Sequence, residues 1–131
     1  MSTRYYLDTA PVIYSVEQIP VFGAVVDARL SATDAILVAS DLTRMECRVK
    51  PLRTGDIELL KDFDAYFEGV VAEIVVLSRE VIDRATEIRA QYSFKTPDAI
   101  HLAAAMVSNC NVFLTNDHRL DRFPGIAVEA V

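Results

Sequence analysis

Four carboxylates come from four separate segments of this sequence, and each stands next to a predicted strand or near the start of a predicted helix. They are Asp8, Glu46, Asp98 and Asp117. If the fold brings them together, they repel one another strongly unless a cation lies among them. Carboxylate oxygens suit Mg²⁺ or Mn²⁺ rather than zinc. Such ions polarise a phosphoryl oxygen and generate hydroxide from water, so the chemistry indicated is metal-assisted hydrolysis of a phosphodiester.

Each of these acids, taken singly, also has an ordinary structural role. Asp8 and Asp117 stand where turn residues are expected, and Asp8 can also cap a short helix. Asp98, in the first turn of a helix, interacts favourably with the helix dipole by roughly 0.3–1 kcal/mol. The segment "TRME" at 43–46 matches a capping box, with Thr43 as the N-cap and Glu46 three positions later. The functional interpretation therefore depends on whether the four acids meet.

Short apolar strands alternate with helices along the chain. The predicted strands are 4–7, 35–40, 73–78, 111–115 and a weaker 126–131, and the predicted helices are a short one near Pro11, then 21–30, 42–50, 56–70, 79–92 and 97–109. This alternation predicts an α/β fold whose parallel sheet is covered by helices on both faces.

The helix over 97–109 determines where Asp98 lies. It runs almost directly into the strand 111–115, so it must descend from the carboxyl edge of the sheet to the amino edge. Its first turn, with Asp98, therefore lies at the carboxyl edge, where open α/β sheets build their sites. The other three acids follow strands and are expected at the same edge. The sequence does not explain how the preceding helix, 79–92, returns the chain to that edge.

Length and composition limit the classes of protein that fit. The chain has 131 residues, of which 52% are hydrophobic, which predicts a single domain over 1–131 with a real core. A net charge of −6 argues against a protein that coats nucleic acid, but not against a nuclease with acids around cations. The two cysteines have no metal-ligand spacing and the N-terminus has no signal peptide, so a reduced, cytoplasmic setting is expected.

One uncharged run, 99–116, approaches the length of a membrane span. His101 and the polar "SNCN" at 108–111 interrupt it, so helix, turn and strand are expected there and no membrane contact. A packed, hydrogen-bonded role is expected for His101, although it could orient Asp98, and a solvated turn for His118. No Gly-rich phosphate loop and no G-x-S-x-G elbow are present, which argues against nucleotide kinases, Rossmann oxidoreductases and serine hydrolases.

At these residues the chain resembles the PIN-domain ribonucleases, and among them the VapC-type toxins of toxin–antitoxin pairs. The matching segments are "YYLDTAPVIY" at 5–14, "TRMECR" at 43–48, "TPDAIHLAAA" at 96–105 and "FLTND" at 113–117. The resemblance implies a three-layer α/β/α domain with a central parallel sheet of four to five strands. It implies that the four acids are catalytic ligands of Mg²⁺ or Mn²⁺, with Thr115 supporting them and Asp121 at most peripheral. It also implies RNA as the substrate, a homodimer, and an antitoxin whose C-terminal segment covers the site.

Two further features concern partners. Arg44, Arg48, Lys50 and Arg53 surround Glu46, and this basic run is either a solvated helix face or a contact for RNA phosphates. The apolar stretches 20–26 and 65–71 are mostly core, but part of them could form a groove for an antitoxin helix or a second protomer.

The leading hypothesis is a metal-dependent endoribonuclease that acts as a toxin. A housekeeping RNA-processing or DNA-directed nuclease of the same fold is one alternative. A noncatalytic interaction module that retains the fold is another.

Overall fold

The computed structural model describes residues 2–32 and 34–131 and contains one five-stranded sheet. Its strands are β1 (Thr3–Leu7), β2 (Ala35–Ser40), β3 (Glu73–Val75), β4 (Val112–Thr115) and β5 (Ala127–Ala130). They lie in the order β3-β2-β1-β4-β5, and every pairing is parallel. The predicted parallel sheet of four to five strands is therefore confirmed.

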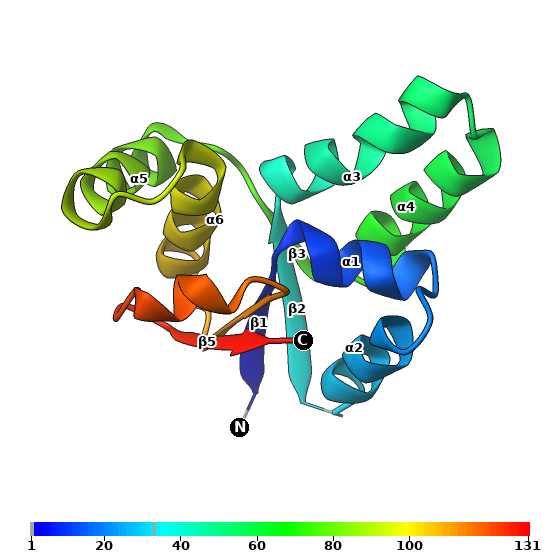
Figure 1. The fold of residues 1–131 in the computed structure, drawn as a ribbon, viewed down its shortest axis with the longest axis horizontal. Helices are drawn as coiled ribbons and strands as arrows, with labels where there is room; N and C mark the ends of the chain where they lie inside the picture. The colour runs from blue at the N-terminus through cyan, green and yellow to red at the C-terminus, as the bar shows by residue number, and fades with distance from the viewer. Residues whose placement is uncertain (1, 33) are drawn as a thin grey trace.

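Helices cover both faces of this sheet. They are α1 (Thr9–Val16), α2 (Phe22–Leu30), α3 (Asp41–Thr54), α4 (Ile57–Gly69), α5 (Arg79–Tyr92) and α6 (Thr96–Val107), with a short 3₁₀ helix, η1 (His118–Arg122). Figure 1 shows α5 and α6 on one side of the sheet and α1 to α4 on the other. This arrangement is the predicted three-layer α/β/α fold.

Alternation along the strands explains the two cores. Tyr6 and Phe113 point to the α5–α6 side, where their rings stack with centroids 5.3 Å apart. Their neighbours Leu7 and Leu114 point to the other side and pack with residues of α1 to α4. All four side chains are fully buried. The central strands are thus apolar on both faces, as parallel strands covered by helices must be.

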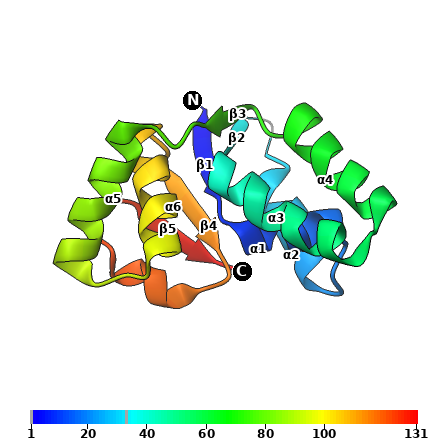
Figure 2. The ribbon, with the colours of Figure 1, turned by 90° about the horizontal axis from the view of Figure 1, so that it is seen from above.

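The strand order reverses around β1. The chain adds β2 and β3 on one side of β1, then crosses to the other side to form β4 and β5. The carboxyl end of β1, where Asp8 stands, is therefore the switch point at which open α/β sheets leave a crevice for ligands. Helices α5 and α6 supply the return path that the sequence did not explain. They lie side by side in opposite directions, so that α6 begins at the carboxyl edge (Figure 2).

Helix starts differ from the prediction in two places. The predicted capping box of Thr43 and Glu46 is wrong: Ser40 is the N-cap of α3, and its partner in the box is Thr43. Strand β2 runs into α3 without a loop, so the cap falls on the last residue of the strand, and Glu46 lies in the second helical turn. Helix α6 begins one residue earlier than predicted, at Thr96, and its N-cap, Lys95, makes no side-chain capping bond.

Two element ends also differ. Helix α3 does not stop at Pro51, which is buried within the helix, but continues to Thr54 and is capped by Gly55, whose φ of 70° suits glycine. Strand β3 ends at Val75 rather than at 78, because the chain turns there with the Ser78 amide donating to the Val76 carbonyl. The helix η1 was not predicted. Among the helices described, none has the length and apolar character to cross a bilayer.

Candidate active site

Asp8 is held in place by the strands on which the site is built. It follows β1 directly, and its Oδ1 accepts the backbone N–H of Thr9 at 2.8 Å as the N-cap of α1. Its Oδ2 accepts the hydroxyl of Thr115, at the end of β4, at 2.8 Å. The expected capping role of Asp8 is therefore observed, and Thr115 lies where the resemblance places a supporting hydroxyl. Both carboxylate oxygens are oriented before any ligand arrives.

Glu46 reaches the same place from the second turn of α3. Its Oε1 accepts the Thr9 hydroxyl at 2.6 Å and lies 2.7 Å from Nε2 of His101. Partial burial acts to raise the pKa of Glu46, but the hydrogen bonds from His101 and Thr9 outweigh it and hold the pKa below its usual value. Glu46 is thus an ionised carboxylate with one oxygen already engaged.

His101 connects this acid to the core. It is 2% exposed, and its Nδ1 lies 2.7 Å from the hydroxyl of Tyr6, which also bonds Ser40. Its Nε2 lies 3.5 Å from Asp8 as well as 2.7 Å from Glu46. The predicted packed, hydrogen-bonded histidine is therefore observed. It contacts Glu46, however, and not Asp98, the acid that the sequence spacing suggested.

Asp98 stands between the other acids in the first turn of α6. Burial is the main cause that raises its pKa, the charge of Asp8 and to a smaller extent that of Asp117 raise it further, and the charges of His101 and Lys95 oppose this rise. The structure gives its carboxylate no hydrogen-bond donor within the described residues, whereas Asp8, Glu46 and Asp117 each have at least two. Its ionised form is therefore disfavoured in the fold as described.

Asp117 caps η1 and is bound by an arginine two residues away. Its Oδ1 accepts the backbone N–H and the Nε–H of Arg119, at 3.0 and 2.9 Å, and its Oδ2 accepts Nη2 at 2.8 Å. The hydrogen bonds from Arg119 lower the pKa of Asp117 to about 2. The expected turn chemistry is thus observed, but Arg119 occupies this carboxylate.

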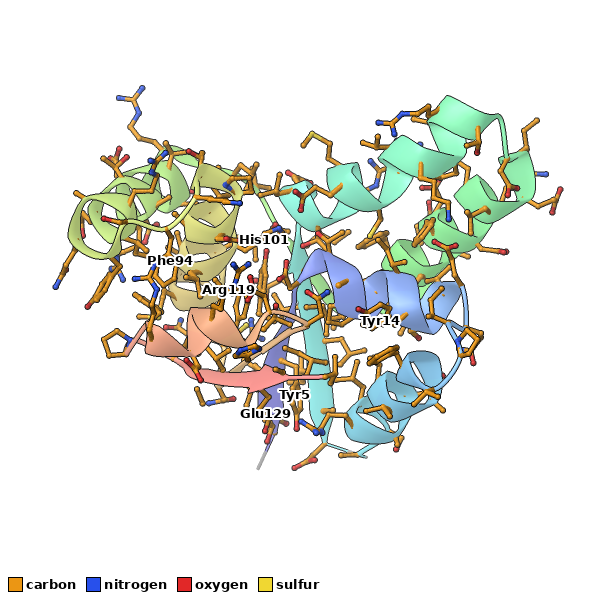
Figure 3. The ribbon with its side chains drawn as sticks, viewed as in Figure 1. Tyr5, Tyr14, Phe94, His101, Arg119 and Glu129 are labelled. Atoms are coloured by element: carbon orange, nitrogen blue, oxygen red, sulfur yellow. The ribbon has the colours of Figure 1, made fainter. Side chains whose placement is uncertain are left out.

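The four acids line two adjoining hollows that share Asp98. Asp8, Glu46 and Asp98 line one hollow of about 290 Å³, together with His101. Asp98 and Asp117 line the other, of about 190 Å³. Figure 3 labels His101 on α6, which lines the first hollow, and Arg119 on η1, which lines the second. Within residues 2–32 and 34–131, no three acidic, histidine or cysteine side chains converge closely enough to hold a metal ion.

The donor set nevertheless fits a divalent cation. Four carboxylates supply the hard oxygen ligands that Mg²⁺ and Mn²⁺ prefer, and Asp98 lacks any other charge partner strong enough to offset its neighbours. Asp8, Glu46, Asp98 and Asp117 would hold such a cation, and Asp117 is at present bound by the Arg119 guanidinium. Asp8 and Glu46 each keep their present donors on one side.

The basic run on α3 is largely paired with acids of its own layer. Arg48 contacts Asp64 at 2.9 Å, Arg44 lies 3.8 Å from the same carboxylate, and Lys50 contacts Glu17 at 3.0 Å. Arg53 is exposed. These contacts agree with a solvated helix face, and the alternative role of the run in phosphate binding stays a prediction.

Several residues of the site were missed from the sequence. Thr9 and Arg119 had no predicted role, although Thr9 adjoins Asp8 in "YYLDT" and Arg119 follows Asp117 by two positions. A hydroxyl or guanidinium group within two residues of a candidate ligand was the signal by which the sequence could have identified them. His118 and Asp121 are exposed on η1, in agreement with the solvated role expected for His118.

Comparisons with known proteins agree with the observed fold. The PIN domain family matches residues 5–126. Among solved structures, the VapBC2 complex of Rickettsia felis bound to a promoter DNA fragment contains a similar chain, with a TM-score of 0.77, 16% identity and 98% of each chain covered. A toxin–antitoxin complex from Klebsiella pneumoniae gives a TM-score of 0.77 at 19% identity, over 97% of this chain and 99% of that one.

A third similar structure is VapC20 of Mycobacterium tuberculosis, a toxin that cleaves the sarcin–ricin loop. Its TM-score is 0.78 at 11% identity, over 95% of this chain and 98% of that one. At such identities the likeness establishes the fold. A search of curated protein sequences gave no significant match. Because the family match spans nearly the whole chain, from β1 to the residue before β5, this protein belongs to the PIN domain family.

Proposed function

We propose that this protein is an endoribonuclease that depends on Mg²⁺ or Mn²⁺ and acts as the toxin of a type II toxin–antitoxin pair. The observation that carries the proposal is the position of Asp98. It lines both hollows, one together with Asp8 and Glu46 and the other together with Asp117, so acids from four distant segments lie near one another at the carboxyl edge of the sheet. A cation there removes a repulsion that the fold otherwise retains.

In this proposal, Asp8, Glu46, Asp98 and Asp117 hold the cation. When bound, the cation supplies a polarised phosphoryl oxygen and a water of lowered pKa. Thr115 orients Asp8 through its hydroxyl at 2.8 Å, and Thr9 orients Glu46 at 2.6 Å. His101 holds Glu46 from the core side at 2.7 Å, so the ligands need little rearrangement on this side of the site.

The toxin role rests on the partners of similar proteins and on an apolar surface. Two of the similar structures described above are toxin–antitoxin complexes. In this chain the stretch 20–26 exposes Val21, Phe22 and Val25, which are 74%, 44% and 41% exposed. Such a surface suits an antitoxin helix or the second protomer of a homodimer. The second candidate stretch, 65–71, offers less, because Phe67 and Val71 are buried.

A noncatalytic module of the same fold is the second candidate. The observation in its favour is that Arg119 occupies Asp117 and that the described acids do not converge on one point. Metal binding separates the two candidates, because a module without a metal site gains no stability from Mn²⁺.

The test combines cleavage and stability on the same samples. Purified wild type is incubated with single-stranded RNA and with DNA of the same sequence, each in Mg²⁺ and in EDTA. We expect Mg²⁺-dependent cleavage of RNA, and a rise in melting temperature with Mn²⁺ that Asp8→Asn with Asp98→Asn largely abolishes.

Asp62→Asn is the matched control, because Asp62 is an exposed acid on α4. Preferential cleavage of DNA would support a DNA-directed nuclease. An equal Mn²⁺ shift in wild type and the double variant would contradict the site. Cleavage that the product of a neighbouring gene suppresses on co-purification would support the toxin over a processing enzyme.

A further inference from the structure

The hollow of about 190 Å³ beside Asp98 and Asp117 contains more positive charge than the rest of the site. It lies between the turn after α5, the start of α6 and η1, and Lys95, Arg119 and Arg122 line it. In Figure 3, Phe94 and Arg119 lie next to each other on this side of α6. Three cations gathered in one hollow need an explanation in a chain whose net charge is −6.

Contacts within the protein fix Arg122 but do not neutralise it. Its guanidinium lies over the ring of Phe94, 3.8 Å from the ring centroid, and its Nη1 donates to the backbone carbonyl of Tyr92. Phe94 itself is only 4% exposed. The guanidinium is therefore held by a ring face and a neutral carbonyl, with no carboxylate partner among the described residues.

Lys95 and Arg119 complete the wall. Lys95 is exposed at the start of α6 and forms no ion pair with the described acids. Arg119 is paired with Asp117, but its side chain is 76% exposed, and that carboxylate is its only anchor among the described residues. The two acids of this hollow are proposed metal ligands. Once a cation takes them, three positive charges face the hollow without partners.

The basic run of α3 shows the contrast. Its Arg48 and Lys50 are paired with Asp64 and Glu17, acids that have no proposed role in the site. In the hollow, by comparison, Lys95 and Arg122 have no carboxylate partner among the described residues. Arg119 is paired with Asp117, which is a proposed ligand of the divalent metal ion. A ligand with negative charge therefore binds more favourably in the hollow than on α3.

The chemistry of the wall specifies the ligand further. The ring of Phe94 is buried beneath Arg122, so the hollow offers guanidinium and ammonium groups and no open aromatic face for a base. Guanidinium and ammonium groups bind phosphate oxygens regardless of sequence. The hollow adjoins the four acids. A phosphate bound in it is therefore the neighbour, along the same strand, of the phosphate that lies at the acids.

We propose that this hollow is a backbone-phosphate subsite for a nucleic-acid strand, occupied by a phosphate next to the one being cut. Lys95 and Arg122 are its fixed cations. Arg119 leaves Asp117 when a divalent cation binds and turns to the phosphate. This inference rests on the proposed nuclease function and adds the residues that hold the substrate.

The experiment measures binding separately from cleavage. Fluorescence anisotropy follows a labelled single-stranded RNA of 15 nucleotides, with Ca²⁺ replacing Mg²⁺, at a series of salt concentrations. Lys95→Ala with Arg122→Ala should lower the salt slope by about 0.7 for each lost contact, or about 1.4 together. The ratio of its dissociation constant to that of wild type should then grow about sevenfold between 0.2 M and 0.05 M salt.

Two further variants, each of which removes one positive charge as Lys95→Ala alone does, accompany it. Lys61→Ala removes an exposed lysine of α4 remote from the hollow, and Arg48→Ala tests the α3 run. Lys61→Ala should bind RNA as wild type does, Arg48→Ala should change the salt slope less than Lys95→Ala does, and unchanged melting temperatures show that the variants fold. Replacing Arg122 also removes its contact with Phe94, so Lys95→Ala is measured alone as well. This single variant should show half of the slope change of the double variant.

The outcomes separate the subsite from the function. Wild-type affinity and slope in the hollow variants overturn the subsite, whether or not RNA is cleaved. If the hollow variants lose binding while wild type cleaves nothing in Mg²⁺, the subsite stands and the nuclease proposal fails. If a hexaglutamate peptide binds the hollow as tightly as RNA does, the hollow receives an acidic protein segment and the subsite is overturned.

Discussion

The two sides of Asp98 are built differently. On one side, Asp8 and Glu46 are held by neutral hydroxyl and amide donors and by a buried histidine, all on strands or α-helices. On the other side, Asp117 stands on a short 3₁₀ helix and is held by the exposed Arg119. The first pair is organised by the core, whereas the second is organised by a single surface contact.

This difference separates the roles of the acids. Ligands fixed by the core determine where a cation binds, because their donors remain after it arrives. A ligand fixed by an exposed ion pair can exchange partners at small cost, since such pairs contribute little in water. We therefore expect substitutions on the first side to affect stability and activity together, and substitutions on the second side to change binding with little effect on the fold.

Asp98 lies between the two sides, and the largest effect is expected there. Asp98→Asn should reduce Mg²⁺-dependent RNA cleavage by at least about 100-fold, as when a transition-state electrostatic term is lost. Its stability without metal should be level or higher, because the ionised carboxylate is the disfavoured form in the fold. A less stable but fully active variant would mean that Asp98 is only a helix-start residue.

The pH dependence of this effect has a definite sign. The pKa of Asp98 is raised in the folded protein, so folding favours its protonated form. The stability it contributes is present at low pH and is lost as the pH rises through the unfolded and then the folded pKa. The melting temperature of Asp98→Asn minus that of wild type should therefore be larger at pH 7 than at pH 3, measured in EDTA. A difference that does not change with pH would show that Asp98 ionises without cost.

Asp8→Asn should lose cleavage to a similar extent but with the opposite effect on the fold. One carboxylate oxygen becomes an amide NH₂, which cannot accept either the Thr115 hydroxyl or the Thr9 amide. A buried donor left without its acceptor costs about 1–3 kcal/mol. Urea unfolding without metal measures this cost. If the Asp8 and Asp98 variants are equally stable, the hydrogen bonds to Asp8 do not stabilise the fold. The distinction between Asp8, which has donors, and Asp98, which has none among the described residues, would then fail.

The sequence predicts the strands and most of their ends well, but it predicts the helix boundaries and the contacts around the site less well. The alternation of apolar strands and helices was sufficient for the parallel three-layer fold, because each strand is short, apolar and separated by a helix. It also placed Asp8 and Asp117 at strand ends, since a strand end is visible as a change of composition. Helix boundaries were less predictable. Ser40 caps α3 from the end of a strand, which the local pattern "TRME" concealed.

Contacts between distant residues were not predictable from spacing. His101 is three residues from Asp98, one helical turn, yet it contacts Glu46, 55 residues away in sequence. The direction of a buried ring depends on which neighbours surround it, here Tyr6 and Ser40, and no local pattern encodes these. The Arg119–Asp117 pair is local, but it belongs to the cap of η1, a helix without a strong apolar period that the sequence did not predict.

His101→Phe should have the next largest effect. It keeps an aromatic ring at this position, although phenyl is larger than imidazole, and it removes the bonds to Glu46 and Tyr6, while the Tyr6 hydroxyl retains Ser40. We expect a cost of about 1–3 kcal/mol in urea unfolding. Since His101 positions Glu46 and touches no substrate, we expect roughly tenfold weaker cleavage and weaker Mn²⁺ binding, as for other residues that orient a ligand.

A loss of stability with unchanged Mn²⁺ affinity would make His101 purely structural. His101→Gln serves as the conservative variant, because its amide can donate to Glu46. It should recover part of the Mn²⁺ affinity that His101→Phe loses. The comparison of the two variants therefore distinguishes the hydrogen bond to Glu46 from the packing of the ring.

The smallest effect, and the sharpest test of the comparison, is expected from Arg119→Ala. If Arg119 competes with the cation for Asp117, its removal should tighten Mn²⁺ binding by about two- to fivefold, the range of an exposed ion pair. The melting temperature in EDTA should hardly change, because η1 retains the buried Leu120. Titration of free Mn²⁺ against the protein measures the affinity directly, without cleavage. Arg119→Lys keeps the charge but loses the paired geometry, so it should fall between the two. Weaker Mn²⁺ binding in Arg119→Ala would mean that the guanidinium holds Asp117 in place for the cation. In that case the second side of Asp98 would also be preorganised, and the two sides would differ in exposure alone.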